Sequence, residues 1–448
     1  MGPVMFRRVR LASFDNGVTA DVTLQRPDRY RHLEAAWSDG KPRIARGGGY
    51  SLAAASFDAD SVVQDMRLFD RILAFDAATR TITVEAGLTL GHLLAFTTKS
   101  GLWLPPLPGY PDITVGGAIA ANVHGKGASQ DGTFRHWVKN VTLFHPDRGW
   151  SSASAHENAE LFEFTLGGFG LSGTIISAQL RLDPLPGGEA WTRMSAVGSL
   201  TEGWERLAEG ADRNGFVYTW HDAAPRRGSF GKGLLVEGGI VPESPLPHDF
   251  VPRYKVLSAS ATDGRYPFAV WGGARTALIN GLYRAASRLR PQERREPLFD
   301  ALFPFARRHA YFRMYGHTGL IECQLLFPKE AAKTVLTALE EKILQHRPPT
   351  VFVSLKAMRG EPQLLRFERD GICMALHMVR NRDGLAFAKV VDDITIENGG
   401  LPSLIKDSRL PRSVVEKCHA GIDEFRALRQ RQDPNRRYQS ELSKRLAL

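Results

Sequence analysis

The sequence predicts an α+β protein of two domains, a glycine-rich first part followed by an antiparallel-sheet domain. Its 448 residues exceed what one ordinary hydrophobic core accommodates. The segment "DPLPGGE" (183–189) is the clearest linker signal in the chain. After it, the glycine-rich composition gives way to strands rich in aromatic residues, so we place a domain boundary at residue 185.

The first part predicts short strands and helices. "RTITVEAG" (80–87) alternates apolar and polar residues, which predicts a half-buried strand. "TLGHLLAFTTKSG" (89–101) has helical spacing, with Thr89 as its cap and Gly101 as its stop. Residues 158–182 predict a short helix, a glycine-rich turn and a long strand.

The second part predicts strands separated by helices, which fits an antiparallel sheet covered on one face. The strand candidates are "GFVYTWHD", "GLIECQLLFP", "TVFVSLKAM" and "GICMALHMV". Apolar residues recur at three and four positions over 329–346, which predicts a helix. The tail predicts two helices divided at Asp433-Pro434. The glycine and aromatic content of 225–275 leaves the order of that segment open.

Composition and charge exclude several classes of protein. Hydrophobic residues make up 43% and charged residues 24%, as in soluble globular proteins. Cys323, Cys373 and Cys418 have no paired spacing, so we expect neither a disulfide framework nor a metal site. We find no signal-peptide pattern and no apolar run of membrane-spanning length, which predicts a cytoplasmic protein. The net charge of +10 suits nucleic acid, anionic lipid or a phosphorylated substrate, and dispersed basic residues leave that choice open.

Three glycine-rich segments stand out in the first part, at 45–56, 108–127 and 166–175. Glycine lets a ligand approach the backbone closely, and successive N–H groups in such turns bind anions such as a pyrophosphate. The run "GGFGLSG" precedes a strand rather than a helix, which argues against a Rossmann fingerprint. The second segment also holds His124 and Lys126, so it combines ligand-binding backbone with titratable and cationic side chains.

The motifs "RGGGYS", "PPLPG…TVGGAIAANVHGKG" and "GGFGLSGTI" resemble the three flavin-contacting segments of the vanillyl-alcohol-oxidase, or PCMH-type, FAD-binding domain. Within that superfamily the chain resembles the decaprenylphosphoryl-beta-D-ribose 2′-oxidase family. That family carries a "TVGGAIA…HGK" segment and a "GG…KDSR" segment near its end, here "GGLPSLIKDSR" (399–409). The resemblance covers nearly the whole chain and is loosest at 190–310.

The resemblance implies a two-domain PCMH-type fold with an inserted antiparallel-sheet domain. The FAD-binding domain would be 1–185, the substrate domain 186–398, and the C-terminal segment 399–448 would return to the FAD domain. Tyr50 stands where many members have a covalently linked His, and Ile113 where others have a Cys, so we expect noncovalent FAD. The expected FAD contacts are Gly47, Gly48, Gly49, Tyr50, Ser51, Gly109, Thr114, Val115, Gly116, Gly117, Ala118, Ala121, Asn122, His124, Gly125, Gly173, Ile175 and Lys406.

The same resemblance suggests catalytic side chains. Lys406 would stabilise negative charge developing on the flavin, although a loop lysine by itself is typical of a solvated surface. An imidazole such as His124 can accept a hydroxyl proton, or it only hydrogen-bonds to backbone, so the base is left open. Lys126 would hold an anionic group or the flavin. Gln324 and Lys356 match pocket residues of the family, whereas the pocket departs from it at Glu322, Met358, Cys373, Ala375 and Ser403.

These features predict an FAD-dependent oxidoreductase. The family's reaction is oxidation of the C2 hydroxyl of a polyprenyl-phosphoryl ribofuranose to the 2-keto sugar, the first half of an epimerisation to arabinose with a short-chain reductase as partner. A lipid-carried substrate implies peripheral contact with the inner face of the membrane, without spanning it. The changed pocket keeps a soluble alditol or aldonolactone open as the substrate. A third alternative is a nucleic-acid or scaffold protein that only retains the fold, and the intact glycine segments argue against it.

Overall fold

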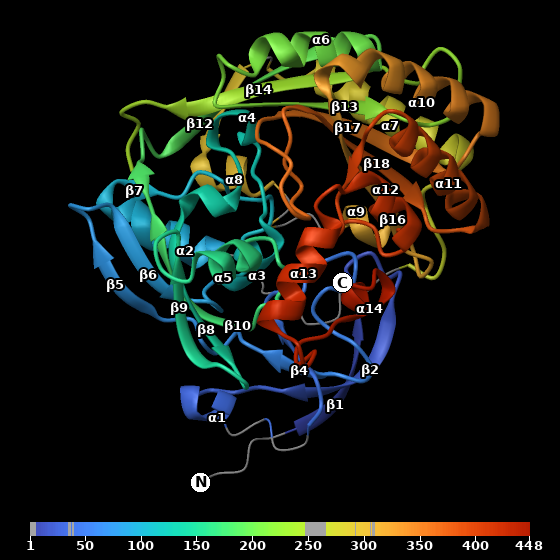
Figure 1. Cartoon of the computed structure of the whole chain (residues 1–448). Coiled ribbons are helices and arrows are strands. Elements are labelled where there is room, and N and C mark those ends of the chain that lie inside the picture. The colour runs from blue at the N-terminus through green and yellow to red at the C-terminus, as the bar shows by residue number, and fades with distance from the viewer. Residues whose placement is uncertain are drawn as a thin grey trace.

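Three main β-sheets and the helices packed on them make up the fold (Figure 1). The computed structural model describes residues 6–34, 37, 40–246, 266–291, 293–304, 306 and 310–448. Residues 247–265, the centre of the segment 225–275 discussed above, lie outside the described residues.

Two of the sheets come from the first part of the chain. The first sheet contains, in spatial order, β1 (Phe6–Ala12), β2 (Thr19–Gln25), β4 (Val62–Asp65) and β3 (Arg43–Arg46). The second, antiparallel sheet contains β5 (Ile72–Asp76), β6 (Thr81–Glu85), β10 (Thr174–Arg181), β8 (Val138–His145) and β9 (Gly149–Ser154). β7 (Leu102–Trp103) pairs separately with β11 (Asp183–Pro184). The helices here are α1 (Tyr30–Glu34), α2 (Leu90–Thr97), α3 (Val115–Ala121), α4 (Ala128–Asp131) and α5 (Ala159–Thr165).

The helix expected at 89–101 is confirmed as α2 and a 3-10 turn. The Thr89 hydroxyl accepts a hydrogen bond from the His92 amide, and Gly101 ends the turn with a φ of 66°. The strand expected at 80–87 is confirmed as β6, but the prediction that it is half-buried was wrong. Thr81 and Glu85 are buried as well as the apolar residues, and the Glu85 carboxylate is paired there with Arg71.

The glycine-rich run after residue 113 forms the helix α3. The Thr114 hydroxyl caps it by accepting from the Gly117 amide, and the Val115 and Gly116 amides donate to carbonyls of Leu88 and Ala86. A Cβ at Gly116 would lie 2.9 Å from the Ala86 Cβ. The helix is therefore fixed by close packing against the five-stranded sheet rather than by helix propensity.

The third sheet is antiparallel and has its strands in the order β15, β12, β14, β13, β17, β18, β16, β19. Their bounds are Glu293–Pro297, Glu189–Val197, Gly233–Val241, Phe216–Asp222, Thr350–Met358, Gly371–Val379, Leu320–Pro328 and Leu401–Pro402, respectively. α6 (Leu200–Gly210), α10 (Ala332–His346) and α11 (Arg382–Glu397) cover one face, as expected (Figure 1). The remaining helices of this part are α7 (Gly273–Arg288), α8 (Leu298–Leu302) and α9 (Ala310–Arg313).

The tail returns to the first two sheets and contains three helices, not the two expected: α12 (Arg412–Cys418), α13 (Ile422–Gln432) and α14 (Glu441–Arg445). The additional break follows from packing. The buried His419 ring donates to the Pro402 carbonyl at 2.9 Å, and Gly421 lies so close to Leu364 that a Cβ would be 2.6 Å from its Cα.

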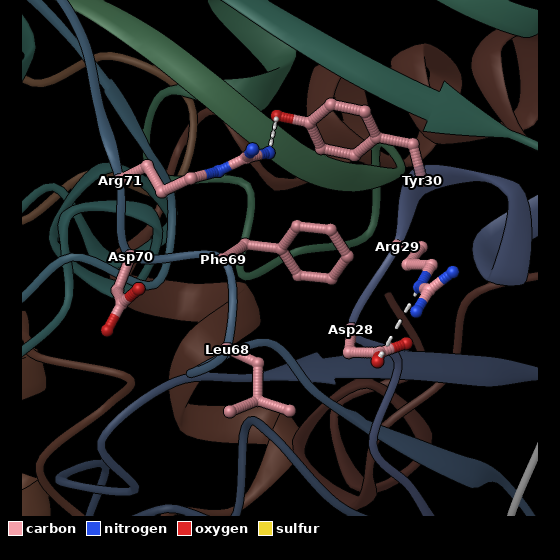
Figure 2. A pocket seen from close by; sticks show the side chains of 7 residues that line it. All are labelled: Asp28, Arg29, Tyr30, Leu68, Phe69, Asp70 and Arg71. Carbon is pink, nitrogen blue, oxygen red and sulfur yellow. Dashed lines mark hydrogen bonds and ion pairs between the residues drawn. The ribbon is translucent and has the colours of Figure 1, made fainter.

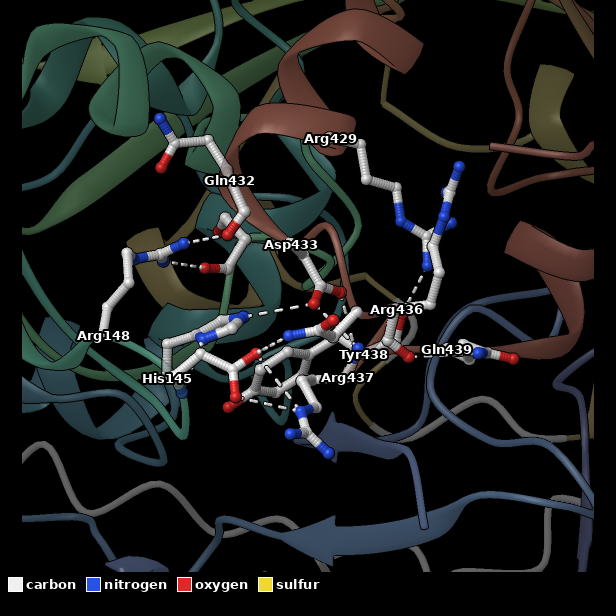
Figure 3. Close-up of polar contacts among 12 residues, drawn as sticks. His145, Arg148, Arg429, Gln432, Asp433, Arg436, Arg437, Tyr438 and Gln439 are labelled. Atoms are coloured by element: carbon white, nitrogen blue, oxygen red, sulfur yellow. Dashed lines mark hydrogen bonds and ion pairs between the residues drawn. The ribbon is translucent and has the colours of Figure 1, made fainter. Parts of the chain in front are cut away.

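A buried polar network ties the tail to β8 (Figure 3). Asp433 accepts hydrogen bonds from the amides of Arg437 and Tyr438 and faces His145 at 3.3 Å. His145, Asp147 and Asp433 place ligand atoms within 4.8 Å of one another, but Asp147 pairs with the Arg437 side chain. The carboxylates are thus engaged within the protein, and the cluster serves to hold the tail in place.

Candidate active site

Two of the glycine segments interlock at the start of α3. A Cβ at Gly47 would collide with the Thr114 hydroxyl, and one at Gly48 with the Asp112 carbonyl oxygen. Gly49 has a φ of 76°, a conformation that favours glycine. We call the backbone of 47–51 together with Asp112 the cradle.

The cradle offers hydrogen-bonding groups to a ligand. Within the described part of the chain, the amides of Gly47, Gly48, Gly49 and Ser51 donate to no protein acceptor. Asp112 is 6% exposed, its Oδ2 accepts from the Tyr50 hydroxyl at 3.0 Å, and its Oδ1 has no hydrogen-bond partner among the described residues. Burial raises the pKa of Asp112 to about 6. Successive unpaired amides suit a pyrophosphate and an unpaired acceptor suits a hydroxyl, so these residues fit FAD.

The third glycine segment packs against the other end of α3. The Gly167 amide donates to the Ile119 carbonyl at 3.0 Å, and the Phe169 amide to the Ala120 carbonyl at 2.8 Å. Asn122 ends α3 with a φ of 43°, and its side chain accepts from the Arg135 amide. The three glycine segments therefore converge on α3, as their resemblance to flavin-contacting segments implies.

The remaining expected FAD contacts differ in exposure. Gly117, Gly109 and Ala121 are half-buried, and a Cβ at Gly117 would meet only the Thr114 hydroxyl. The others of this group lie in the protein interior: Val115, Gly116, Ala118, Gly125, Gly173 and Ile175. The amides of Val115, Gly116 and Ala118 already donate to backbone carbonyls.

The face of the large sheet that the helices leave uncovered carries polar side chains. Ile321, Cys323 and Leu325 of β16 pack under the helices, so Glu322 and Gln324 lie on the opposite face. By the strand register, Glu322 lies opposite His377 of β18.

Lys356 of β17 belongs to the same uncovered face. It lies between Cys373 of β18 and Tyr218 of β13 in the register. Burial and the charge of Lys406 lower the pKa of Lys356. Burial raises the pKa of Cys373 to about 11, so its thiol stays protonated.

The "KDSR" loop places Lys406 between this face and the cradle. The Leu52 amide, just after the cradle, donates to the Ile405 carbonyl at 3.0 Å, and the Ser403 amide donates to the Gln324 carbonyl at 2.9 Å. The loop is thereby joined to both sides, and Lys406 is brought to Glu322.

The Glu322 carboxylate lies between the Lys406 ammonium and the His377 imidazole. Its Oε1 lies 3.2 Å from Lys406 Nζ and its Oε2 lies 3.4 Å from His377 Nε2. His377 Nδ1 lies 2.8 Å from the Tyr311 hydroxyl, which in turn contacts the Tyr315 hydroxyl. Burial alone would raise the pKa of Glu322, but Lys406 and His377 outweigh it and lower that pKa to about 2. The site therefore holds a permanent carboxylate.

His124 follows α3 and lies near both lysines. Burial and the charges of Lys356 and Lys406 lower its pKa to about 3, so the ring is neutral. His124 Nδ1 lies 3.3 Å from the Gly125 carbonyl, and an N–H there leaves Nε2 as the acceptor nitrogen. The Phe367 ring stacks on the imidazole with centroids 6.0 Å apart.

Lys126 contacts α8 and β13. Its ammonium donates to the Ala301 carbonyl and lies 5.3 Å from the ring centroids of Phe216 and Tyr218. The structure thus brings His124, Lys356 and Lys406 together, and places Lys126 beside Tyr218 on the neighbouring strand.

A surface pocket of about 490 Å³ lies elsewhere (Figure 2). Seven residues line it, with Tyr30 stacked on Phe69 in its wall and Arg71 paired with the buried Glu85. None of the residues expected to bind FAD or to act in catalysis lines this pocket.

Comparisons with known proteins agree with this geometry. Residues 30–149 match the FAD binding domain family. Decaprenylphosphoryl-beta-D-ribose oxidase of Mycolicibacterium smegmatis is 26% identical over 426 residues, 92% of this chain and 91% of that protein. L-gulonolactone oxidase of Mus musculus is 31% identical over 138 residues, 31% of each chain. Delta(24)-sterol reductase of Homo sapiens is 30% identical over 113 residues, 25% of this chain and 22% of that protein.

With the cradle and the neighbouring cations, these matches define an FAD-dependent oxidoreductase that acts on CH–OH groups. The fold is the PCMH-type FAD-binding fold, as the sequence predicted. Within that superfamily, the chain is similar over most of its length to decaprenylphosphoryl-beta-D-ribose oxidase.

Sequence reasoning missed several residues of the site: Asp112, Tyr311, Phe367 and His377. His377 had a usable signal, because it lies two residues beyond Ala375 on a predicted strand and therefore shares its face. Phe367 and Tyr311 had none, since each belongs to a loop or a short helix whose path depends on the whole fold.

Proposed function

We propose that the chain oxidises the C2 hydroxyl of a polyprenyl-phosphoryl ribofuranose to the 2-keto sugar. The observation that carries this proposal is the pair Lys356 and Lys406 beside a neutral His124, with Lys126 nearby. The positive charges of these three lysines attract an anionic substrate such as a glycosyl phosphate. A relative that this chain matches over most of its length is named for a decaprenylphosphoryl ribose, which supports the same substrate class.

In the proposed mechanism, FAD supplies the hydride acceptor when it is bound in the cradle. His124 Nε2 accepts a hydrogen bond from the hydroxyl group and so orients it, since the neutral imidazole has an acceptor nitrogen there. Lys406 supplies a fixed positive charge at the flavin side, and Glu322 keeps that ammonium in place at 3.2 Å. Gln324 and Lys356 orient the sugar from the sheet face.

The keto sugar would pass to a short-chain reductase, which completes an epimerisation to arabinose. We propose peripheral contact with the inner face of the membrane, where a lipid-carried substrate lies. In the described part of the chain, no helix combines the length and the apolar character needed to cross a bilayer.

A soluble alditol or aldonolactone is the second candidate substrate, favoured by one observation. The buried carboxylate of Glu322 can accept hydrogen bonds from sugar hydroxyls, and it reduces the net positive charge that a phosphate would meet.

Anaerobic bleaching of the flavin absorption separates the two candidates. The flavin-loaded protein is mixed with polyprenyl-phosphoryl ribose, with xylitol or with L-gulono-1,4-lactone. Bleaching by the lipid-linked sugar alone supports the first candidate. Bleaching by the soluble compounds and not by the lipid-linked sugar would replace it with the second.

A further inference from the structure

The helix α7 is amphipathic in the opposite sense from an ordinary surface helix. Its buried residues are the polar Thr276, Asn280 and Ser287, and Asn280 donates at 2.8 Å both to the Asp222 carboxylate and to the Val351 carbonyl. On the outer side, Leu278 and Leu282 are 63% and 61% exposed. A surface helix normally buries its leucines and exposes its polar residues, so the outer side of α7 is built to meet an apolar environment.

The exposed apolar residues continue along one line. Leu289, directly after the helix, is 88% exposed and lies seven residues beyond Leu282, on the same side of the helix. Phe268, before the helix, is 63% exposed. We call Leu278, Leu282 and Leu289, with the arginines described next, the α7 face.

The charge around these leucines has a single sign. Residues 266–291 contain four arginines and no Asp or Glu. Arg284 pairs with the buried Asp222 at 3.6 Å, whereas Arg275, Arg288 and Arg290 are exposed. Leucines flanked by exposed arginines match the two layers of an anionic lipid surface, acyl chains beneath charged headgroups.

We propose that the α7 face seats the protein on an anionic bilayer. At 16 residues the helix is about 24 Å long, which suits a helix lying in the interface plane rather than across the membrane. The preceding Trp271 packs against the rings of Tyr311 and Tyr315, and Tyr311 bonds to His377 of the site. The α7 face therefore lies next to the candidate active site. The proposal depends on no particular substrate.

Sedimentation with lipid vesicles tests the α7 face on the full-length, flavin-loaded protein. The vesicles contain either phosphatidylcholine alone or phosphatidylcholine and phosphatidylglycerol in equal parts. We expect binding to the anionic vesicles, and a weakening of at least tenfold in the triple variant Leu278→Ser, Leu282→Ser, Leu289→Ser. The triple variant Arg275→Gln, Arg288→Gln, Arg290→Gln should weaken binding by a similar factor, since each arginine near the surface contributes to attraction.

Matched controls change the same residue types elsewhere. Leu73→Ser removes an exposed leucine of β5. The double variant Arg7→Gln, Arg8→Gln removes two exposed arginines of β1, and Figure 1 shows β1 at the opposite end of the molecule from α7. Both should bind vesicles like the wild type.

Three results would overturn the proposal. The first is no binding of the wild type to anionic vesicles, or equal binding by the α7 variants. The second is a lower melting temperature of the leucine variant, which would mean that another part of this chain covers the face. The third is a wild-type dimer that the leucine variant dissociates, without vesicle binding, which would make the face an interface between two copies.

Discussion

Replacing Glu322 with Gln removes one buried charge while keeping the shape of the side chain. The two carboxylate oxygens lie 3.2 Å from Lys406 Nζ and 3.4 Å from His377 Nε2, and the side chain is 8% exposed. Although burial opposes ionisation, these partners lower the pKa of Glu322 from 4.5 to about 2. Each pKa unit corresponds to about 1.4 kcal/mol, so the ionised carboxylate contributes about 3 kcal/mol to the folded state.

The pH dependence of this contribution has a definite sign. Since the folded-state pKa is the lower one, the stabilisation is complete above pH 4.5 and is lost as the pH falls toward 2. At neutral pH, Glu322→Gln should therefore unfold at lower urea concentration, with a free energy of unfolding lower by about 3 kcal/mol. The exposed Glu341 of α10 provides the control, and Glu341→Gln should change stability by less than about 0.5 kcal/mol. Equal stability of Glu322→Gln and wild type at neutral pH, or a difference that persists unchanged into acid, would refute the reasoning.

Four further predictions concern the cradle and His124. His124→Gln should slow flavin reduction by substrate about 10²-fold in stopped-flow measurements, because the hydroxyl is no longer oriented, while leaving the flavin spectrum intact. Because the His124 pKa is lowered from 6.5 to about 3, its neutral ring stabilises the fold above pH 6.5, and wild type should lose this stability toward pH 3 whereas His124→Gln does not. Gly48→Ala should weaken FAD binding at least tenfold in a fluorescence titration, since its Cβ collides with the Asp112 carbonyl; Gly281→Ala, with no atom within 4 Å, should leave binding unchanged. Acid precipitation should release the FAD into the supernatant, because Tyr50 cannot form a histidyl link, and colour kept in the pellet would contradict this.

Local elements of the fold were predictable because their signals are local. The α2 helix has a threonine cap and a glycine stop within thirteen residues, and the hydrogen bond and the φ angle that define them are present. The α3 helix was not predicted, because two of its seven residues, Gly116 and Gly117, are glycines with low helix propensity. Contacts with Ala86 and Leu88, far away in the sequence, decide its conformation.

The candidate site likewise contains residues that the sequence predicted and residues that it did not. Lys406, His124, Gln324 and Lys356 belong to sequence motifs that resemble a known family, and the structure brings them to one place. The partners that give the site its charge balance were not predictable, because they depend on strand order. His377 faces Glu322 only because β18 lies beside β16, although the two residues are 55 positions apart in sequence, with a whole strand, β17, between them.

The other residues of the "KDSR" motif fix the loop that carries Lys406. Arg409 binds Asp392 of α11 and also Asp407, which fixes the loop to the helical side of the large sheet.

Ser408 fixes the other side of the loop. It donates to Asp15 at 2.5 Å and accepts from Arg380 at 2.9 Å, so it joins the N-terminal strands to the end of β18. Asp407, Ser408 and Arg409 are thus engaged elsewhere, and Lys406 is the residue of the motif that pairs with Glu322. A substitution at Asp407 or Ser408 would therefore move the ammonium without touching it, which accounts for a motif in which three residues position the fourth.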